Sequence, residues 1–250
     1  MIRWMWAFLD RPLPQFDRAA EFWCAVTDAD LSPRRGADQE FATFLPRHAE
    51  ADACLKLQGV SGGGGAHLDL DVDDVARTTR VAIEQHGASL LLRDGRDLAV
   101  LRTPGGQLFC VSKWAGHARR PPTVEHPDGS ASRVDQVTFD ISPEHFAWEA
   151  GFWSGLTGWE LRPSKLPEFV RLDVPAELPI NILLQRRDTS GPAGAHVDVA
   201  CSDVDQVRAL HESLGASKVA DGKAWQVMHD PVGGVYCLTP RDPRTGRLPG

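Results

Sequence analysis

Four segments from the first half of this chain recur in the same order in its second half. The spacing between partners falls by one residue from each match to the next, as small loop deletions would produce. Self-similarity at a nearly fixed period indicates a duplicated structural unit, so we predict two tandem copies of one domain. The matched pairs are residues 21–27 (EFWCAVT) and 151–157 (GFWSGLT), 65–70 (GAHLDL) and 194–199 (GAHVDV), 86–89 (HGAS) and 214–217 (LGAS), and 100–110 (VLRTPGGQLFC) and 227–237 (VMHDPVGGVYC).

The stretch between the copies is rich in turn-forming residues. Residues 115–132 contain an Arg-Arg-Pro-Pro run and a His-Pro-Asp-Gly-Ser run, which are typical of an exposed linker. Residues 241–250 show no periodicity, and we expect them to form a flexible tail. The predicted organisation is a first domain over residues 1–114, a linker over 115–132, a second domain over 133–240 and the tail.

Strand and helix periodicities alternate along the second copy. Residues 134–141 alternate in polarity as a strand does. Ser142 and Pro143 then offer an N-cap and a proline at the first helical position. Each copy is therefore expected to run strand, helix, strands, and then the same pattern again. Further strands of the second copy are predicted over residues 169–172, 180–184, 196–199 and 235–239.

A second helix is predicted after the strand at residues 196–199. Asp203 can cap its first turn, with Gln206 three residues later, and Gly215 suits a left-handed end. An apolar stripe at helical spacing is expected to pack against the sheet. The stripe consists of Val207, Leu210 and Leu214.

Composition excludes several classes of protein. Hydrophobic residues make up 42% of the chain and charged residues 24%, enough for each half to bury a core. The formal net charge of −7, with acidic and basic residues interspersed, argues against nucleic acid as a partner. No stretch approaches the roughly 20 apolar residues of a membrane span, and the start lacks a signal peptide, so we expect a cytoplasmic protein. The five cysteines are widely spaced without a CxxC pair and are predicted to be thiols.

The repeated motifs resemble the glyoxalase / bleomycin-resistance / extradiol-dioxygenase superfamily, also called vicinal oxygen chelate. The resemblance rests on a Gly-x-His strand at Gly194 and His196, the Asp-Val helix start at Asp203, the turn at residues 230–233 and the helix end near Trp159. It implies an α+β fold of two tandem glyoxalase-like domains. Each domain would be a pair of βαβββ modules whose sheet curls around a cleft.

In metal-dependent members of that superfamily, inward-facing His, Gln and Glu side chains hold a divalent metal, which polarises the oxygens of the substrate. Leucine, tryptophan and lysine at such positions are not ordinary ligands, and both copies carry Cys where the resemblance implies a last-strand Glu. The resemblance therefore implies no cofactor and no usual divalent metal site in either copy. Zinc or another divalent metal at Gln136, His196 and Cys237 is the alternative. The matching positions are Gln136, Leu183, His196 and Cys237 in the second copy, and Trp6, Lys56, His67 and Cys110 in the first.

Strand alternation places Asp198 on the same face as His196, and Asp69 on the same face as His67. A polar face of this kind suits ligand contact or a general base, whereas the alternative is a structural histidine bonded to backbone. We assign catalytic roles to His196, Gln136 and Cys237. We assign substrate-binding roles to Trp6, Lys56, His67, Cys110 and Asp198.

The remaining positions each have two interpretations. Cys237 and Cys110 are expected to point into the cleft, either as reactive thiols or as small buried hydrophobes. Lys56 could hold an anionic substrate or be solvated. Trp6 could line an aromatic pocket, together with Trp4 and Phe8 on its face, or fill the core.

Two classes of function follow. One is a glyoxalase-like enzyme acting on a small oxygenated metabolite, a lyase or isomerase rather than a conventional extradiol dioxygenase. The other is a non-catalytic protein of the bleomycin-resistance type that sequesters a drug or metabolite. A third hypothesis is that one copy is purely structural and the duplication replaces a homodimer. The expected partner is a small molecule, and the chain is expected to be a monomer or a homodimer.

Overall fold

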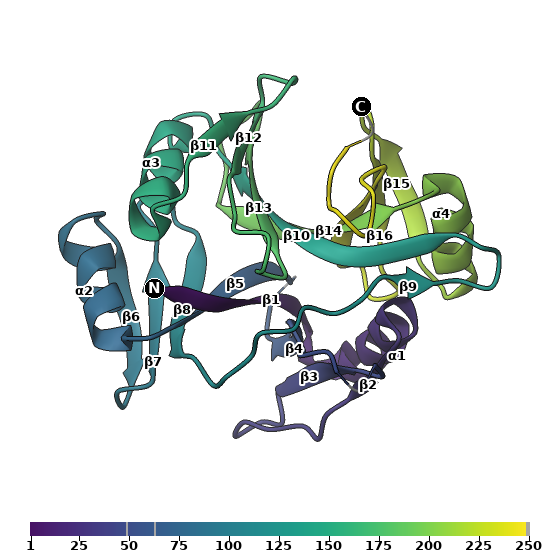
Figure 1. Cartoon of the computed structure of the whole chain (residues 1–250), viewed down its shortest axis with the longest axis horizontal. Coiled ribbons are helices and arrows are strands. Elements are labelled where there is room, and N and C mark those ends of the chain that lie inside the picture. The colour runs from purple at the N-terminus through teal and green to yellow at the C-terminus, as the bar shows by residue number, and fades with distance from the viewer. Residues whose placement is uncertain (49, 63, 249–250) are drawn as a thin grey trace. The chain divides into compact units, whose positions relative to one another are not determined.

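The computed structural model describes residues 1–48, 50–62 and 64–248 and contains βαβββ modules in tandem (Figure 1). A short helix η1 (Leu13–Gln15) follows the first strand, and a short strand β9 (Val124–Glu125) lies between the copies. The first copy consists of β1 (Ile2–Pro12), α1 (Phe16–Thr27), β2 (Ala29–Leu31), β3 (Phe41–Pro46), β4 (Leu55–Val60), β5 (Gly65–Val72), α2 (Val75–Glu84), β6 (Ser89–Asp94), β7 (Leu98–Arg102) and β8 (Leu108–Lys113). The second consists of β10 (Ala131–Ile141), α3 (Phe146–Thr157), β11 (Leu161–Pro163), β12 (Phe169–Leu172), β13 (Asn181–Arg186), β14 (Gly194–Cys201), α4 (Val204–Ser213), β15 (Ser217–Asp221), β16 (Gln226–His229) and β17 (Val235–Thr239).

Each copy contributes one open sheet with the same strand order. The orders are β2-β3-β4-β1-β5-β8-β7-β6 and β11-β12-β13-β10-β14-β17-β16-β15. In each sheet the first strands of the two modules are neighbours, and the first strand of the second module pairs in parallel with the last strand of that module. The predicted α+β fold of tandem, paired βαβββ modules is confirmed.

The tertiary contacts divide the chain into two compact units; four of the five dividing points fall inside β1, β5, β10 and β14, and the fifth lies between β8 and β9. Each unit therefore combines one module of the first copy with one module of the second. The domain boundaries at residues 114 and 133 stay a prediction. Unit 1 consists of Met1–Ala7, His67–Ala118 and Val137–Ala195, and unit 2 of Phe8–Ala66, Arg119–Gln136 and His196–Gly250.

Aromatic residues form the core of unit 1. Trp153 of α3 is fully buried, and its ring centroid lies 5.3 Å from that of Phe109 on β8 and 4.8 Å from that of Phe139 on β10. Glu149 of the same helix is also buried and accepts a hydrogen bond from the backbone N–H of Gly105 at 2.8 Å. Unit 1 is thus stabilised by contacts between α3 of the second copy and β8 of the first.

Unit 2 is built in the corresponding way. Trp23 of α1 packs edge-on against Tyr236 of β17, with ring centroids 5.2 Å apart. Its indole N–H donates to Asp230 at 3.0 Å, and Arg11 pairs with the same carboxylate at 2.5 Å. Because Arg11 and Asp230 are both fully buried, each charge depends on the other for compensation.

The helix ends agree with the sequence in one case and differ in another. Asp203 caps α4 by accepting a hydrogen bond from the backbone N–H of Gln206, and Gly215 has a φ of 96° after the helix, both as predicted. The expected N-cap at Ser142 is wrong. Residues 143–145 form a turn, the helix begins at Phe146, and Ser142 Oγ lies 3.0 Å from His145 Nδ1.

The buried stripe of α4 differs from the prediction. Val207 is buried, but Leu214 is 37% exposed. His211 takes the inward place, with Nδ1 3.0 Å from the Tyr236 hydroxyl. Burial lowers the pKa of His211 to about 3, so the imidazole is neutral and serves as a polar core residue. No helix in the described part of the chain is long and apolar enough to span a membrane.

Candidate functional site

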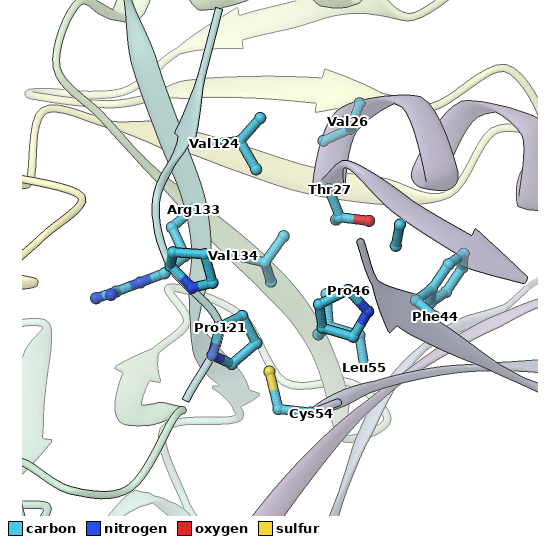
Figure 2. A pocket seen from close by; sticks show the side chains of 12 residues that line it. Val26, Thr27, Phe44, Pro46, Cys54, Leu55, Pro121, Val124, Arg133 and Val134 are labelled. Atoms are coloured by element: carbon cyan, nitrogen blue, oxygen red, sulfur yellow. The ribbon is translucent and has the colours of Figure 1, made fainter. Parts of the chain in front are cut away.

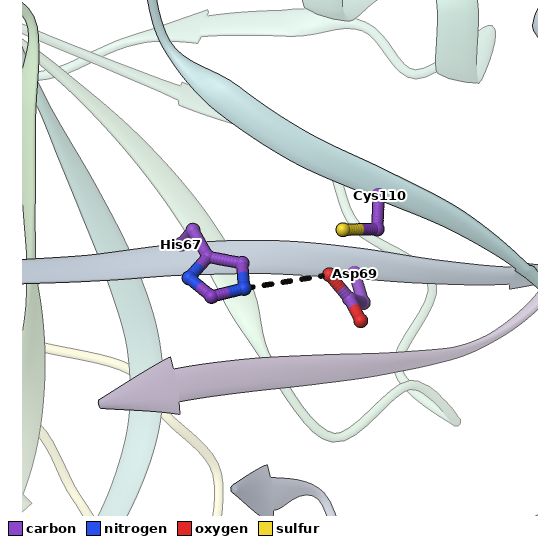
Figure 3. Close-up of side chains that lie close together, drawn as sticks. All are labelled: His67, Asp69 and Cys110. Carbon is purple, nitrogen blue, oxygen red and sulfur yellow. Dashed lines mark ion pairs between the residues drawn. The ribbon is translucent and has the colours of Figure 1, made fainter. Parts of the chain in front are cut away.

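Strands β5 and β8 bring three potential metal ligands of the first copy together. Their parallel register pairs Asp69 with Cys110, so these two side chains share one face, and His67 lies on that face two residues earlier. One ligand atom from each side chain lies within 4.8 Å of the others. His67 Nε2 lies 3.8 Å from Asp69 Oδ1, with Cys110 Sγ directed toward the pair (Figure 3).

The second copy repeats the arrangement. The register of β14 and β17 pairs Asp198 with Cys237, and His196 precedes Asp198 by two residues. These three residues are buried, their ligand atoms also lie within 4.8 Å of one another, and His196 Nε2 is 3.4 Å from Asp198 Oδ1. The structure therefore brings His196 and Cys237 together as the strand phase predicted.

Gln136 and Arg241 contact the same carboxylate. Gln136 Nε2 donates to Asp198 Oδ2 at 2.5 Å, and Arg241 Nη1 lies 3.6 Å from that oxygen. Arg241 also pairs with Asp135 at 2.5 Å. Burial alone would lower the pKa of Arg241, but Asp135 and Asp198 raise it above its ordinary value. The sequence predicts that Arg241 begins a flexible tail. In the structure Arg241 is buried and provides a positive charge beside the second cluster.

The other predicted residues of the first copy lie in different units. Trp6 is in unit 1, where its indole N–H donates to Asp71 at 3.0 Å and its ring contacts His117 edge-on. Lys56 is in unit 2, half-buried on β4, with Nζ 4.9 Å from the ring centroid of Phe8. The convergence of Trp6 and Lys56 with the first cluster stays a prediction.

A pocket in unit 2 lies apart from the predicted residues (Figure 2). It has a volume of about 30 Å³ and a largely apolar lining that includes Val26, Phe44 and Leu55. Cys54 faces it, but burial raises the pKa of this thiol to about 12, so the reactive thiolate is not formed near neutral pH. Since the space suits about one or two water-sized groups, this pocket is not a substrate site.

The donor sets fit a divalent metal, and zinc in particular. Bonds of about 2.0–2.3 Å in a tetrahedral site place ligand atoms about 3.5 Å apart, close to the 3.4 Å between His196 and Asp198. Imidazole, carboxylate and thiolate together match a borderline-soft ion. Three protein ligands also leave a coordination position for a substrate, as catalytic zinc sites do.

The expectation of no cofactor is therefore wrong. It is overturned by the two His–Asp–Cys clusters and by the similarity to solved dioxygenases described below. The positions implied by the resemblance provide only one candidate ligand on each strand. Because β5 and β14 each present a His and an Asp two residues apart, each strand offers two ligands, and Asp69 and Asp198 complete the sets.

A family model described as "Glyoxalase-like domain" matches residues 6–112 and 136–239, and the chain belongs to this family. No curated protein matches the chain.

Solved structures share the fold over nearly the whole length. The 2,3-dioxygenase LapB from Pseudomonas sp. KL28 is 11% identical, with a TM-score of 0.65 over 94% of this chain and 90% of that one. The 2,2',3-trihydroxybiphenyl 1,2-dioxygenase from Sphingomonas wittichii strain RW1 is 12% identical, with a TM-score of 0.64 over 96% and 90%. An extradiol ring-cleaving dioxygenase from B. fuscum is 13% identical, with a TM-score of 0.62 over 96% and 72%.

Proposed function

We propose that this chain is a metal-dependent glyoxalase-like enzyme that converts a small oxygenated metabolite at its His–Asp–Cys clusters. The observation that carries the proposal is the convergence of His196, Asp198 and Cys237 in one buried group, repeated by His67, Asp69 and Cys110. The proposal also draws on the shared fold with dioxygenases, one of which is named for 2,2',3-trihydroxybiphenyl, a compound with neighbouring oxygens.

In the second cluster, His196, Asp198 and Cys237 would hold the ion. A bound divalent metal supplies Lewis-acid polarisation of substrate oxygens. Gln136 donates to one oxygen of Asp198, while the other oxygen faces His196, so the amide fixes the rotation of the carboxylate. A hydrogen-bonded ligand of this kind holds its orientation without rearrangement when the site is filled.

Arg241 sets the charge of this site. Asp135 and Asp198 together carry two negative charges, and Arg241 offsets one of them. The remaining negative charge, with a thiolate at Cys237, is matched to a divalent cation. Arg241 therefore limits the affinity of the site for metal.

The test is metal content and the Co(II) spectrum of the whole chain. We expect one zinc ion for each cluster after reconstitution, and Co(II) to give an intense thiolate charge-transfer band. His196→Ala and His67→Ala should each remove one ion, because two remaining ligands do not hold a stable site.

Cys201→Ser is the matched control, because Cys201 lies on β14 outside the cluster and burial raises its pKa to about 12. It should bind metal like the parent chain. Unchanged metal content in both His variants would contradict the proposal. If metal binds as expected, oxygen uptake with catechol distinguishes ring cleavage from a lyase or isomerase reaction. Binding of a ligand without turnover would favour sequestration.

A further inference from the structure

We infer that Asp71 and His117 form a proton-accepting pair beside the first cluster, and that the acid–base step of this protein is carried by its first copy. The inference rests on the proposed function, since it assigns a role next to the His67–Asp69–Cys110 group. Its starting point is a row of polar side chains on one face of β5. Asp71 lies two residues beyond Asp69, a separation of about 6.6 Å along a strand.

Asp71 is fixed in a single orientation. It is 3% exposed and accepts hydrogen bonds on both carboxylate oxygens. Ser112 Oγ donates to Oδ1 at 2.7 Å, and the Trp6 indole N–H donates to Oδ2 at 3.0 Å. Ser112 lies two residues beyond Cys110 on β8, so Asp71 and its hydrogen-bond donor lie on the same two strands as the metal cluster.

Tryptophans hold His117 in place, although it lies beyond the last strand of the first copy. The Trp114 indole N–H donates to the backbone carbonyl of His117 at 2.8 Å. The imidazole of His117 stacks on the ring of Trp4, with ring centroids 6.0 Å apart. It packs edge-on against Trp6, with ring centroids 4.8 Å apart. The guanidinium of Arg3 lies over the ring of Trp114, with Cζ 5.5 Å from the ring centroid. A histidine restrained by so many contacts is positioned for one geometry.

The two ring nitrogens of His117 have different surroundings. Nδ1 is buried, lies 3.8 Å from Asp71 Oδ2, and makes no hydrogen bond within the described residues. The side chain as a whole is 27% exposed, so the opposite side of the ring is open. This arrangement favours a proton on Nδ1, facing the carboxylate, and a free lone pair on Nε2.

The chemistry is a single proton transfer. The O–H bond of a bound hydroxyl ligand breaks, an N–H bond forms at Nε2, and the ligand keeps the electron pair as an oxyanion. His117 becomes an imidazolium whose charge Asp71 offsets. The charged group paired with the ring is Asp71 on β5, and Arg3 on β1 lies over Trp114; the contacts from β8 and β1 at Ser112, Trp4 and Trp6 are neutral.

No equivalent pair is found among the described residues of the second copy. The strand registers pair Asp71 with Ser112 in one copy and Ala200 with Thr239 in the other, so Ala200 stands in the place of Asp71. The residue after β17 that reaches the second cluster is Arg241, which cannot accept a proton near neutral pH. The two copies have therefore diverged, and proton transfer belongs to the first.

The first experiment needs no substrate. Diethyl pyrocarbonate acylates neutral imidazole, and mass spectrometry of the whole chain after brief exposure at pH 7 gives the rate at each histidine. We expect Asp71→Asn to speed acylation of His117 at pH 7, because loss of the facing carboxylate favours the neutral ring, and to leave His229 unchanged. An unchanged rate at His117 would overturn the pairing with Asp71, whatever the metal content of the protein.

The second experiment uses 4-nitrocatechol, whose colour reports loss of its proton, with zinc-loaded protein. We expect the parent chain to ionise the bound probe about one pH unit below the variant His117→Gln, the size of effect a neighbouring charge produces. His229→Gln should behave like the parent chain, and binding at high pH, where the probe is already ionised, should not depend on His117.

The outcomes separate the two proposals. Identical ionisation of the probe in parent and His117→Gln overturns the role of His117 while leaving the metal clusters intact. Failure of the chain to bind zinc overturns the proposed function, and the acylation rates then decide the Asp71–His117 pair alone.

Discussion

At the scale of single residues, two buried carboxylates outside the clusters differ in how their negative charge is compensated. Asp230 is compensated by Arg11, a full countercharge at 2.5 Å. Glu149 accepts hydrogen bonds from the Gly105 N–H and the Thr103 hydroxyl, and His145 adds only a smaller electrostatic attraction. Burial therefore raises the pKa of Glu149 above its ordinary value despite these hydrogen bonds.

Glu149 should make the protein less stable as pH rises. Its folded pKa is raised, so the folded state keeps a proton that the unfolded state loses, and stability falls between the ordinary value of 4.5 and the folded value. Glu149→Gln lacks this charge and should gain stability relative to the parent chain across that window. Urea unfolding between pH 4.5 and 7.5 measures the difference, which should grow as the pH rises. A difference that does not change with pH would contradict this explanation.

Some site residues have positions that follow from the local strand pattern, whereas others are positioned by contacts with residues distant in sequence. His196, Cys237 and their first-copy partners could be predicted, because strand phase alone decides which face they occupy. His117 could not, because it follows the last strand in a segment without periodicity and is held by tryptophans distant in sequence. Arg241 could not be predicted either, because it also follows a last strand in a segment without periodicity, and its partners Asp135 and Asp198 are distant in sequence.

At the scale of elements, α2 and α4 begin identically in the two copies. Asp74 accepts from the backbone N–H of Arg77 at 2.9 Å, and Asp203 from that of Gln206 at 3.0 Å. In each copy this helix follows the first strand of the second module (Figure 1). These starts could be predicted because the capping bond is local, whereas the start of α3 was displaced by a turn at Pro143.

Asp203→Ala should cost about 1 kcal/mol of stability, the usual effect of removing an N-cap side chain. Asp203→Asn keeps an accepting oxygen and should change stability by a few tenths of that. The midpoint of urea unfolding measures both. Equal losses in the two variants would show that the charge of Asp203, and not its hydrogen bond to Gln206, stabilises α4.

At the scale of the whole molecule, the duplication followed from the repeat and the fold class from the resemblance, but the composition of the compact units followed from neither. Hydrophobic patterns show which face of an element is buried, yet they do not show which module covers it. The aromatic contacts of Trp153 with Phe109, and of Trp23 with Tyr236, lie within units that combine both copies.

A fragment of residues 1–114 should therefore not fold as a monomer. It would expose Phe109 and Trp23, which are fully buried in the complete chain. Size-exclusion chromatography and circular dichroism should show an aggregated, unfolded or dimeric fragment, and co-expression with residues 115–250 should restore a one-to-one complex. A monomeric fragment with cooperative unfolding would contradict this expectation.

The division of the chain inside its strands also bears on how the protein can change over generations. Because each compact unit takes a module from both copies, deletion of either copy removes part of both cores. Selection for folding alone thus retains both halves of the duplication, whatever happens to their chemistry. The inward faces of β5 and β14 are then free to diverge, and the difference between Asp71 in one copy and Ala200 at the equivalent position of the other is the result of that freedom.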